Sequence, residues 1–327
     1  MGHKQLSIED REVIMKELGK GSRVRAIGRE LGRAASTVSR EIRRNDRGRG
    51  YGAHRAQTRA LDLRHKPRRP LKLAHEPLRQ YVDQKLRQYW SPEQIAGRLQ
   101  HEGASGPMRI SHETIYRFIQ REAERGVSYE RYLRQGHRRH SYGWRGKRRF
   151  KRIRNTVSIE QRPAVVAERS RLGDWESDTL RGQSRKPAGI ATHVERKSRY
   201  LLAAKLESRK AKAYNEATIR AFEQRADLPR HTLTVDHGME FSEFKTLEEA
   251  LKVQVFFATP YHAWERGTNE NTNGLLRQFF PKRRDLTGVH PRELEQVVQL
   301  LNHRPRKCLG YRTPTEALRE DTVAFGS

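Results

Sequence analysis

The amino-acid sequence predicts a multidomain protein, with an all-α first half followed by an α/β domain built around one mixed sheet. Residues 1–155 carry 39 Lys and Arg against 16 Asp and Glu, whereas residues 156–327 carry 29 against 23. Apolar residues at helical spacing fill the first part, and short apolar runs typical of strands begin near residue 156. A length of 327 residues fits two or three domains.

The overall charge of the chain indicates a polyanionic partner. The formal net charge is +29, which solubility alone does not require. The single cysteine, Cys308, excludes a disulfide framework and any Cys-based zinc site, and it fits a reducing cytosol. The sequence contains no apolar window long enough for a bilayer and no signal-peptide pattern, so we expect a cytoplasmic protein without a membrane partner.

Residues 1–50 have the pattern of a helix-turn-helix DNA-binding domain. Three short helices are expected over residues 7–21, 23–32 and 34–45, the first starting with a capping box of Ser7 and Asp10. Ser36 is the expected N-cap of the third helix. Its outward face carries groups that can contact base edges and phosphates: Ser36, Thr37, Ser39, Arg40, Arg43 and Arg44. A generic three-helix bundle with a basic surface is the alternative.

A second helical unit is expected over residues 76–133, after a basic linker at residues 51–75. Ser91, Pro92 and Gln94 form a capped helix start, and a further helix is expected from Ser111. This arrangement resembles a second helix-turn-helix, although a packing module or a dimer element would show the same pattern.

A second basic linker is expected over residues 134–158. Residues 134–154 contain ten Lys and Arg and no acid, interleaved with Tyr142, Trp144 and Phe150. Such a run is often a solvated tail, but here it joins two folded regions. We therefore interpret it as a linker that follows DNA phosphates.

Residues 159–327 are expected to form the α/β domain. Five strands are expected at residues 174–182, 188–195, 199–207, 231–238 and 253–260. Helices are expected at residues 212–226, 244–252, 267–280 and 290–304. Three successive strands followed by alternating helices and strands predict a mixed sheet of five strands.

Three acidic residues in this domain lie where a metal site can be built. Asp178 is on the first strand, Asp236 ends the strand before a His-Gly turn, and Glu270 begins a helix. Magnesium prefers oxygen ligands, and carboxylates at strand ends and helix starts can converge on it. Asp174 and Glu176 lie on the same strand as Asp178, and the spacing alone does not choose among the three.

The helix that carries Glu270 has one polar face. Glu270, Asn273, Gly274 and Arg277 share this face, and leucines and phenylalanines cover the opposite one. Glu270 is therefore expected to face a polar site. Asn273 and Arg277 are expected to contact the DNA backbone, and Asn269 and Asn271 are further candidates for phosphates.

Four blocks of sequence resemble a known family. "GDWESDT", "TVDHGMEF", "PYHAWERGTNENTNGLLRQFFPK" and "LNHRPRKCLGYRTP" are similar to conserved blocks of insertion-sequence transposases of the IS-thirty family. That family belongs to the Asp-Asp-Glu transposases and retroviral-type integrases. The resemblance implies an RNase H-like fold in which Asp178, Asp236 and Glu270 bind two Mg²⁺ or Mn²⁺ ions and catalyse DNA cleavage and strand transfer.

The resemblance also implies partners. These are double-stranded DNA, as terminal inverted repeats and as target, and further copies of the chain, in a dimer or a higher assembly on DNA at the bacterial nucleoid. His237 stands where the family more often has Asn, which leaves the tuning of the metal site open. Family members suggest a circular DNA intermediate, on which this sequence is silent.

Several other readings stay open at this stage. A regulator that binds DNA without chemistry and a ribonuclease acting on RNA–DNA hybrids are the main rivals, and a Tyr or Ser recombinase is a weaker one. Tyr261 and Trp264 could stack on a base or pack in the core. Arg304, Arg306 and Lys307 could face DNA or cap the preceding helix.

Overall fold

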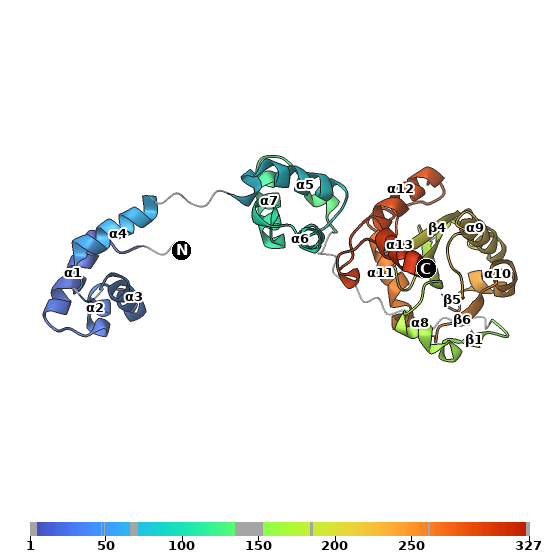
Figure 1. Ribbon diagram of the computed structural model, residues 1–327, viewed down its shortest axis with the longest axis horizontal. Coiled ribbons are helices and arrows are strands. Elements are labelled where there is room, and N and C mark those ends of the chain that lie inside the picture. Colours follow the sequence, from blue (N-terminus) through green and yellow to red (C-terminus); the bar gives the residue numbers. More distant parts are fainter. Residues whose placement is uncertain are drawn as a thin grey trace. The chain divides into compact units, whose positions relative to one another are not determined.

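The computed structural model divides into two compact units, Met1–Pro70 and Leu71–Ser327 (Figure 1). It describes residues 5–46, 48, 50–65, 71–134, 153–183, 186–260 and 262–324. Most of the expected basic linker, with Tyr142, Trp144 and Phe150, lies outside the described residues.

The first unit is a helical domain with a small apolar core. Its helices are α1 (Ile8–Gly19), α2 (Val24–Glu30), α3 (Ala35–Asn45) and α4 (Ala53–His65). Ile14, Ile27 and Val38, one from each of the first three helices, are fully buried together. The capping box of Ser7 and Asp10 is present, as the sequence predicts.

The close crossing of α2 and α3 depends on Gly28. A Cβ atom at this position would lie 2.9 Å from the carbonyl oxygen of Arg33, in the turn that joins the two helices. The third helix begins after Ala34, so the prediction that Ser36 is its N-cap is wrong. Ser36 lies within the first turn, where its hydroxyl accepts a hydrogen bond of 3.3 Å from Arg40.

The expected basic linker at residues 51–75 is largely structured. It contains helix α4, whose Gln57 side chain accepts a 2.6 Å hydrogen bond from Arg11. Arg11 also forms a buried ion pair of 2.8 Å with Glu41 on α3. The prolines and arginines of this segment predicted a connector without helices. Helix α4 instead belongs to the first unit, because the buried guanidinium of Arg11 needs acceptors and Gln57 on α4 supplies one.

The second unit begins with three helices, α5 (Glu76–Arg87), α6 (Pro92–His101) and α7 (His112–Glu124). Ser91 and Gln94 form the predicted capping box, and Ser111 caps α7 as predicted. These helices share a core that includes the fully buried Ile95 and Ile115.

Helix α6 packs against the C-terminal part of the same unit. Arg98 forms two hydrogen bonds, of 2.6 and 2.7 Å, with the carboxylate of Glu316 on α13 (Pro314–Ala324). The Tyr311 ring covers Gly97 so closely that a Cβ there would lie 2.3 Å from it. Helix α6 therefore packs within the unit, and the helix-turn-helix interpretation of residues 76–133 stays a prediction.

The rest of the unit is built on one mixed sheet of six strands, in the order β1-β6-β5-β2-β3-β4. The strands are β1 (Val157–Ser158), β2 (Asp174–Arg181), β3 (Gly189–Glu195), β4 (Leu201–Leu206), β5 (Thr232–Val235) and β6 (Gln254–Phe257). The predicted number of five strands is wrong. The missed strand, β1, has only two residues and lies in a basic segment without an apolar run.

Helices cover both faces of this sheet (Figure 1). Helices α9 (Ala211–Glu223) and α10 (Phe244–Leu251) pack on one face, and α11 (Gly267–Leu276) and α12 (Pro291–Asn302) pack on the other. A short helix, α8 (Ala164–Glu168), precedes β2. Along β2, Trp175 enters the first core and Leu180 the second, as the alternation of side chains in a strand requires.

We predict that His193 makes stability depend on pH. This β3 residue is fully buried, its Nδ1 lies 2.8 Å from the Ser177 hydroxyl, and burial lowers its pKa to about 3. Unfolded histidine titrates near pH 6.5, so the free energy of unfolding should fall as the pH decreases from about 6.5. The contribution is at most about 1.4 kcal/mol per pH unit.

Urea unfolding at several pH values would measure this slope. His193→Asn should remove it, whereas the exposed His101→Asn should leave it unchanged. An equal slope in the wild type and in His193→Asn would contradict the assignment.

Candidate active site

The register of two parallel strands brings Asp178 and Asp236 together. Strand β2 pairs with β5 from Asp174 opposite Thr232 to Glu176 opposite Thr234. Two residues further along each strand, Asp178 therefore lies across from Asp236, which follows the end of β5. Neighbouring strands are about 4.8 Å apart, so the two carboxylates lie next to each other.

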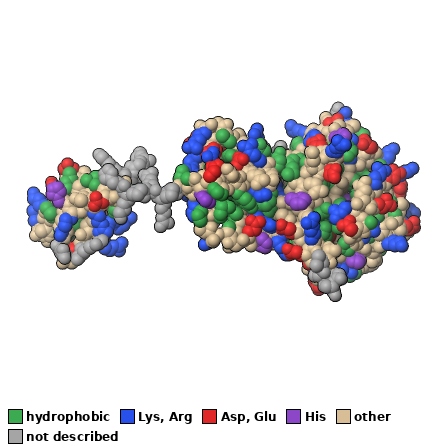
Figure 2. All heavy atoms as spheres, turned by 45° about the horizontal axis from the view of Figure 1, so that its top comes forward, with side chains coloured by type: hydrophobic (Ala, Val, Ile, Leu, Met, Phe, Trp, Pro, Cys, Tyr) green, Lys and Arg blue, Asp and Glu red, His purple; other side chains and the backbone are tan. Residues whose placement is uncertain are grey.

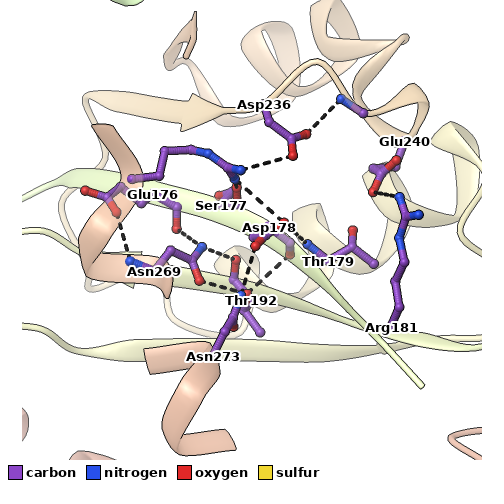
Figure 3. Close-up of polar contacts among 12 residues, drawn as sticks. Glu176, Ser177, Asp178, Thr179, Arg181, Thr192, Asp236, Glu240, Asn269 and Asn273 are labelled. Carbon is purple, nitrogen blue, oxygen red and sulfur yellow. Dashed lines mark hydrogen bonds and ion pairs between the residues drawn. The ribbon is translucent and has the colours of Figure 1, made fainter. Parts of the chain in front are cut away.

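Arg266 lies between these two carboxylates. Its Nη2 is 3.0 Å from Asp236 Oδ2, and its Nη1 is 3.7 Å from Asp178 Oδ1. The same Nη1 donates a 3.3 Å hydrogen bond to the carbonyl oxygen of Ser177. Figure 3 shows Asp178 and Asp236 close to each other at this end of the sheet.

The remaining carboxylate contacts fix the orientation of both aspartates. The Thr179 amide donates to Asp178 Oδ1 at 2.8 Å, and Asn273 Nδ2 donates to Asp178 Oδ2 at 2.9 Å. The Gly238 amide donates to Asp236 Oδ1 at 2.8 Å. Burial raises the pKa of Asp178, and the positive charge of Arg266 opposes this effect.

Gly238 is required by close packing around Asp236. A Cβ atom at this position would lie 2.9 Å from Asp236 Oδ1 and 2.6 Å from Glu240 Oε2. Glu240 is buried, and its other carboxylate oxygen accepts a 3.1 Å hydrogen bond from Arg181. Any residue with a Cβ atom at this position would therefore have to displace one of the two carboxylates, so the turn after β5 needs glycine.

The structure chooses among the three acids of β2. Glu176 is fully buried, contacts Arg196, and accepts a 2.9 Å hydrogen bond from the Asn269 amide. Asp174 is also buried, and Arg171 and Thr232 bind it at 2.9 and 2.8 Å. The side chain of Asp178 keeps 28 % of its surface exposed, so it is the acid of β2 that can reach a ligand.

Glu270 stands apart from the two aspartates. It is exposed in the first turn of α11, one turn before Asn273, which touches Asp178. Within the described ranges, no three His, Cys, Asp or Glu side chains come close enough together to hold one metal ion. The structure thus brings Asp178 and Asp236 together and leaves Glu270 outside the cluster, on the helix that contacts it.

The donor atoms at this site nevertheless suit a divalent cation. The Oδ1 atom of Asn273 is buried and has no hydrogen-bond partner in the part of the chain that the structure describes. The same Asn273 side chain binds Asp178, which lies next to the carboxylate of Asp236. Carboxylate and amide oxygens are the ligands of Mg²⁺ and similar hard cations.

A basic pocket lies beside Asp178. Its volume is about 510 Å³, and its lining residues are Thr179, Arg181, Gly182, Gln183, Arg277, Lys282 and Arg283. Arg277 is fixed by a 2.7 Å hydrogen bond from its Nη1 to the Arg181 carbonyl. The sequence analysis found Arg277 but missed Arg181, Lys282 and Arg283. The basic run after "FF" at residues 279–280 was the available signal for the last two.

Several residues expected at the DNA are placed elsewhere. Asn269 is fully buried and donates to the Glu176 carbonyl at 2.9 Å. Arg304 is buried and binds Gln94 at 2.8 Å, so the expectation that it faces DNA is wrong. Arg306 donates to the Leu301 carbonyl at the end of α12, as the capping alternative predicts.

The remaining candidates for contact with DNA are exposed or lie outside the described part of the chain. Lys307 pairs with Glu93 at 2.7 Å, and Asn271 is exposed on α11. Tyr261 and the side chain of Trp264 lie outside the described part of the chain.

The outer face of α3 is basic and open. Ser36, Ser39, Arg40, Arg43 and Arg44 are exposed, and Thr37 is half-buried. Figure 2 shows Lys and Arg side chains over the surface of the first unit. The buried face of the same helix carries Val38 and Glu41, so the helix separates its core side from its polar side.

Comparisons with known proteins match both parts of the chain. A helix-turn-helix domain model matches residues 3–45, and an integrase core domain model matches residues 169–263. The transposase for insertion sequence element IS4351 of Bacteroides fragilis is 36 % identical, over 99 % of each chain. Transposase InsI for insertion sequence element IS30A of Escherichia coli strain K12 is 38 % identical, over 96 % of this chain and 83 % of that protein.

This chain belongs to the IS30 family of insertion-sequence transposases. It is an Asp-Asp-Glu transposase, with an N-terminal helix-turn-helix domain and an RNase H-like integrase core whose active site depends on a divalent metal. The integrase core match contains Asp178 and Asp236 and ends before Glu270.

Two further findings complete the comparison. The catalytic core domain of BIV integrase matches 47 % of this transposase and 97 % of its own chain, at 18 % identity with a TM-score of 0.36, too low for the fold assignment to rest on it. In the described part of the transposase, no helix has the length and apolar composition needed to cross a bilayer.

We predict different costs for the acids of β2. Glu176→Gln leaves the buried Arg196 without its counter-charge, so the free energy of unfolding should fall by about 3 kcal/mol. Asp178→Asn, at a partly open position beside a second carboxylate, should change it by less than about 1 kcal/mol.

Urea unfolding of both variants at neutral pH would measure the difference. Equal losses in the two variants would mean that the buried contacts of Glu176 do not distinguish it from Asp178.

Proposed function

We propose that this transposase binds the terminal inverted repeats of its insertion sequence and catalyses DNA cleavage and strand transfer with Asp178, Asp236 and Glu270. The observation that carries the proposal is the pair of aspartates that lie across from each other, Asp178 within β2 and Asp236 directly after β5. Glu270 supplies the third carboxylate from α11, whose Asn273 already contacts Asp178.

We assign two Mg²⁺ or Mn²⁺ ions to this site. Bound there, they would activate the attacking oxygen and stabilise the leaving 3′-oxygen of an in-line displacement. The residues of the chain position the carboxylates: Asn273 and the Thr179 amide orient Asp178, and the Gly238 amide orients Asp236. Glu176 holds the start of α11 against β2, which fixes the helix that carries Glu270.

DNA is assigned to two surfaces of the transposase. The open face of α3, with Arg40, Arg43 and Arg44, has the donors for phosphates and base edges. The basic pocket beside Asp178, with Arg277 near Asn273, suits the phosphates next to the cleaved bond. Both surfaces fit the net charge of +29.

Assembly follows from the reaction. Cutting two element ends and joining them to target DNA needs more than one active site, so we propose a homodimer or a higher assembly on DNA. The proposed place of action is the nucleoid in the bacterial cytoplasm. A regulator without chemistry is the second candidate, and the exposed Glu270, apart from the aspartates, is the observation that favours it.

Substitution of Glu270 tests the proposal directly. On labelled duplexes carrying the element ends, the wild type should cleave and join with Mg²⁺ and should do neither with EDTA. Glu270→Gln should bind these duplexes within about twofold of the wild type but lose at least about 100-fold in cleavage rate, because a metal ligand stabilises the transition state.

The exposed Glu295→Gln on α12 is the matched control and should leave the cleavage rate unchanged. If Glu270→Gln cleaves like this control, Glu270 is an ordinary surface acid. If the wild type binds the ends but does not cleave with any divalent metal, the regulator is the better description.

Neutral substitutions on α3 should weaken DNA binding through lost phosphate contacts. Arg43→Gln/Arg44→Gln should lower the magnitude of the slope of log K against log salt by about two, one for each lost charge. Fluorescence anisotropy with a duplex of the element end, at several salt concentrations, measures this slope.

The exposed Arg220→Gln on α9 should leave the slope unchanged. A double variant with the wild-type slope would place the DNA on another face of the first unit.

A further inference from the structure

Arg266 takes the central position between the two aspartates of the active site. Its guanidinium faces three oxygen atoms, from Asp236, from Asp178 and from the Ser177 carbonyl, at 3.0, 3.7 and 3.3 Å. Only 16 % of its side-chain surface is exposed. The three oxygens come from two strands and form the kind of acceptor cluster that a hard cation takes.

The other oxygens of the two carboxylates are engaged by the protein. Asp178 Oδ2 accepts from Asn273, and Asp236 Oδ1 accepts from the Gly238 amide. Arg266 faces the remaining two oxygens, Asp236 Oδ2 and Asp178 Oδ1, and the second of these also accepts a 2.8 Å hydrogen bond from the Thr179 amide. A divalent cation shared by the two aspartates must approach the same oxygens.

Electrostatics explains why the arginine is needed there. Two carboxylates held across neighbouring strands repel each other, and the repulsion is stronger where water is partly excluded. A guanidinium relieves it with one positive charge. A divalent cation and the guanidinium of Arg266 cannot both stay between the carboxylates, because like charges at such short distances repel as strongly.

We propose that Arg266 is a built-in counter-ion that competes with the divalent metal for Asp178 and Asp236. This inference rests on the proposed function of the two aspartates as metal ligands. Metal binding displaces the guanidinium, which becomes available to a DNA phosphate. Because a phosphate also draws Arg266 away from the aspartates, DNA and metal binding strengthen each other, and the metal affinity is low until DNA is bound.

The test measures metal affinity without catalysis. Free Mn²⁺ is followed by electron paramagnetic resonance in titrations of the full-length protein, and the binding of Asp178→Asn/Asp236→Asn is subtracted as background. Arg266→Gln, which removes the charge and keeps hydrogen-bond donors, should bind Mn²⁺ about tenfold more tightly than the wild type. Arg199→Gln is the matched control, because its guanidinium contacts Thr268 and neither aspartate.

A second arm tests the coupling to DNA. A duplex of the element end that carries a 2′,3′-dideoxynucleotide at its 3′ end, and so has no 3′-hydroxyl to transfer, should raise the Mn²⁺ affinity of the wild type by about fivefold. It should raise that of Arg266→Gln much less. Arg266→Lys keeps the charge, so its Mn²⁺ affinity should stay near that of the wild type and below that of Arg266→Gln. Comparison of these two variants separates the effect of charge from a loss of stability caused by substitution at this position.

The outcomes separate the inference from the proposed function. If the wild type binds no Mn²⁺ above the background with or without DNA, the aspartates are not metal ligands, and both proposals fail. If the wild type binds Mn²⁺ but Arg266→Gln binds it equally or more weakly, Arg266 only holds the aspartates in place. The competition is then overturned, while the metal site stands.

Discussion

The hydrogen bonds between two parallel strands, β2 and β5, set the geometry on which the active site depends. The paired part is short, from Asp174 to Glu176 on β2. Asp178 and Asp236 are the first acidic groups past the paired part. A slip of the register by one residue would turn one of the two carboxylates to the other face of the sheet. The apolar alternation that fixes β2 between its two cores is therefore also what keeps the aspartates together.

Helix α11 depends on the same strand through a polar anchor. Glu176 and Asn269, both fully buried, join β2 to the first turn of α11, and Thr192 on β3 joins them at 3.2 Å. Buried polar groups of this kind are costly unless every partner is present, and here they fix where the helix starts. Apolar packing of Leu275 and Leu276 holds the other end of the helix. The polar anchor and the apolar packing thus give helix α11 a defined position on the sheet.

The sequence predicted more about the elements than about how they meet. Capping residues such as Ser7, Ser91 and Ser111 were correct because a cap is a local interaction. The two-residue β1 has no sequence pattern of its own and exists through its pairing with β6. The third helix starts at Ala35 rather than after Ser36 because the close crossing at Gly28 sets its beginning.

The candidate site shows the same division. Motif resemblance predicted Asp178, Asp236 and Glu270 as the site residues, but spacing did not separate Asp178 from Asp174 and Glu176. That choice depends on the buried partners of the other two, which come from distant parts of the chain. The bridging position of Arg266 was also missed. Sequence spacing does not say where a guanidinium four residues before Glu270 points, and the folded sheet places it between Asp178 and Asp236.

The seating of Tyr311 on Gly97, with the paired contacts of Arg98 and Glu316, fixes helix α6 to the C-terminal part of the same unit. Helix α7 shares the small core of α6 and is therefore fixed to the same part of the unit. Any DNA base or phosphate that α7 contacts is then separated from the cut bond by a length that the protein defines. The position of cleavage relative to a contacted sequence would thus be a property of side-chain packing far from the metal site.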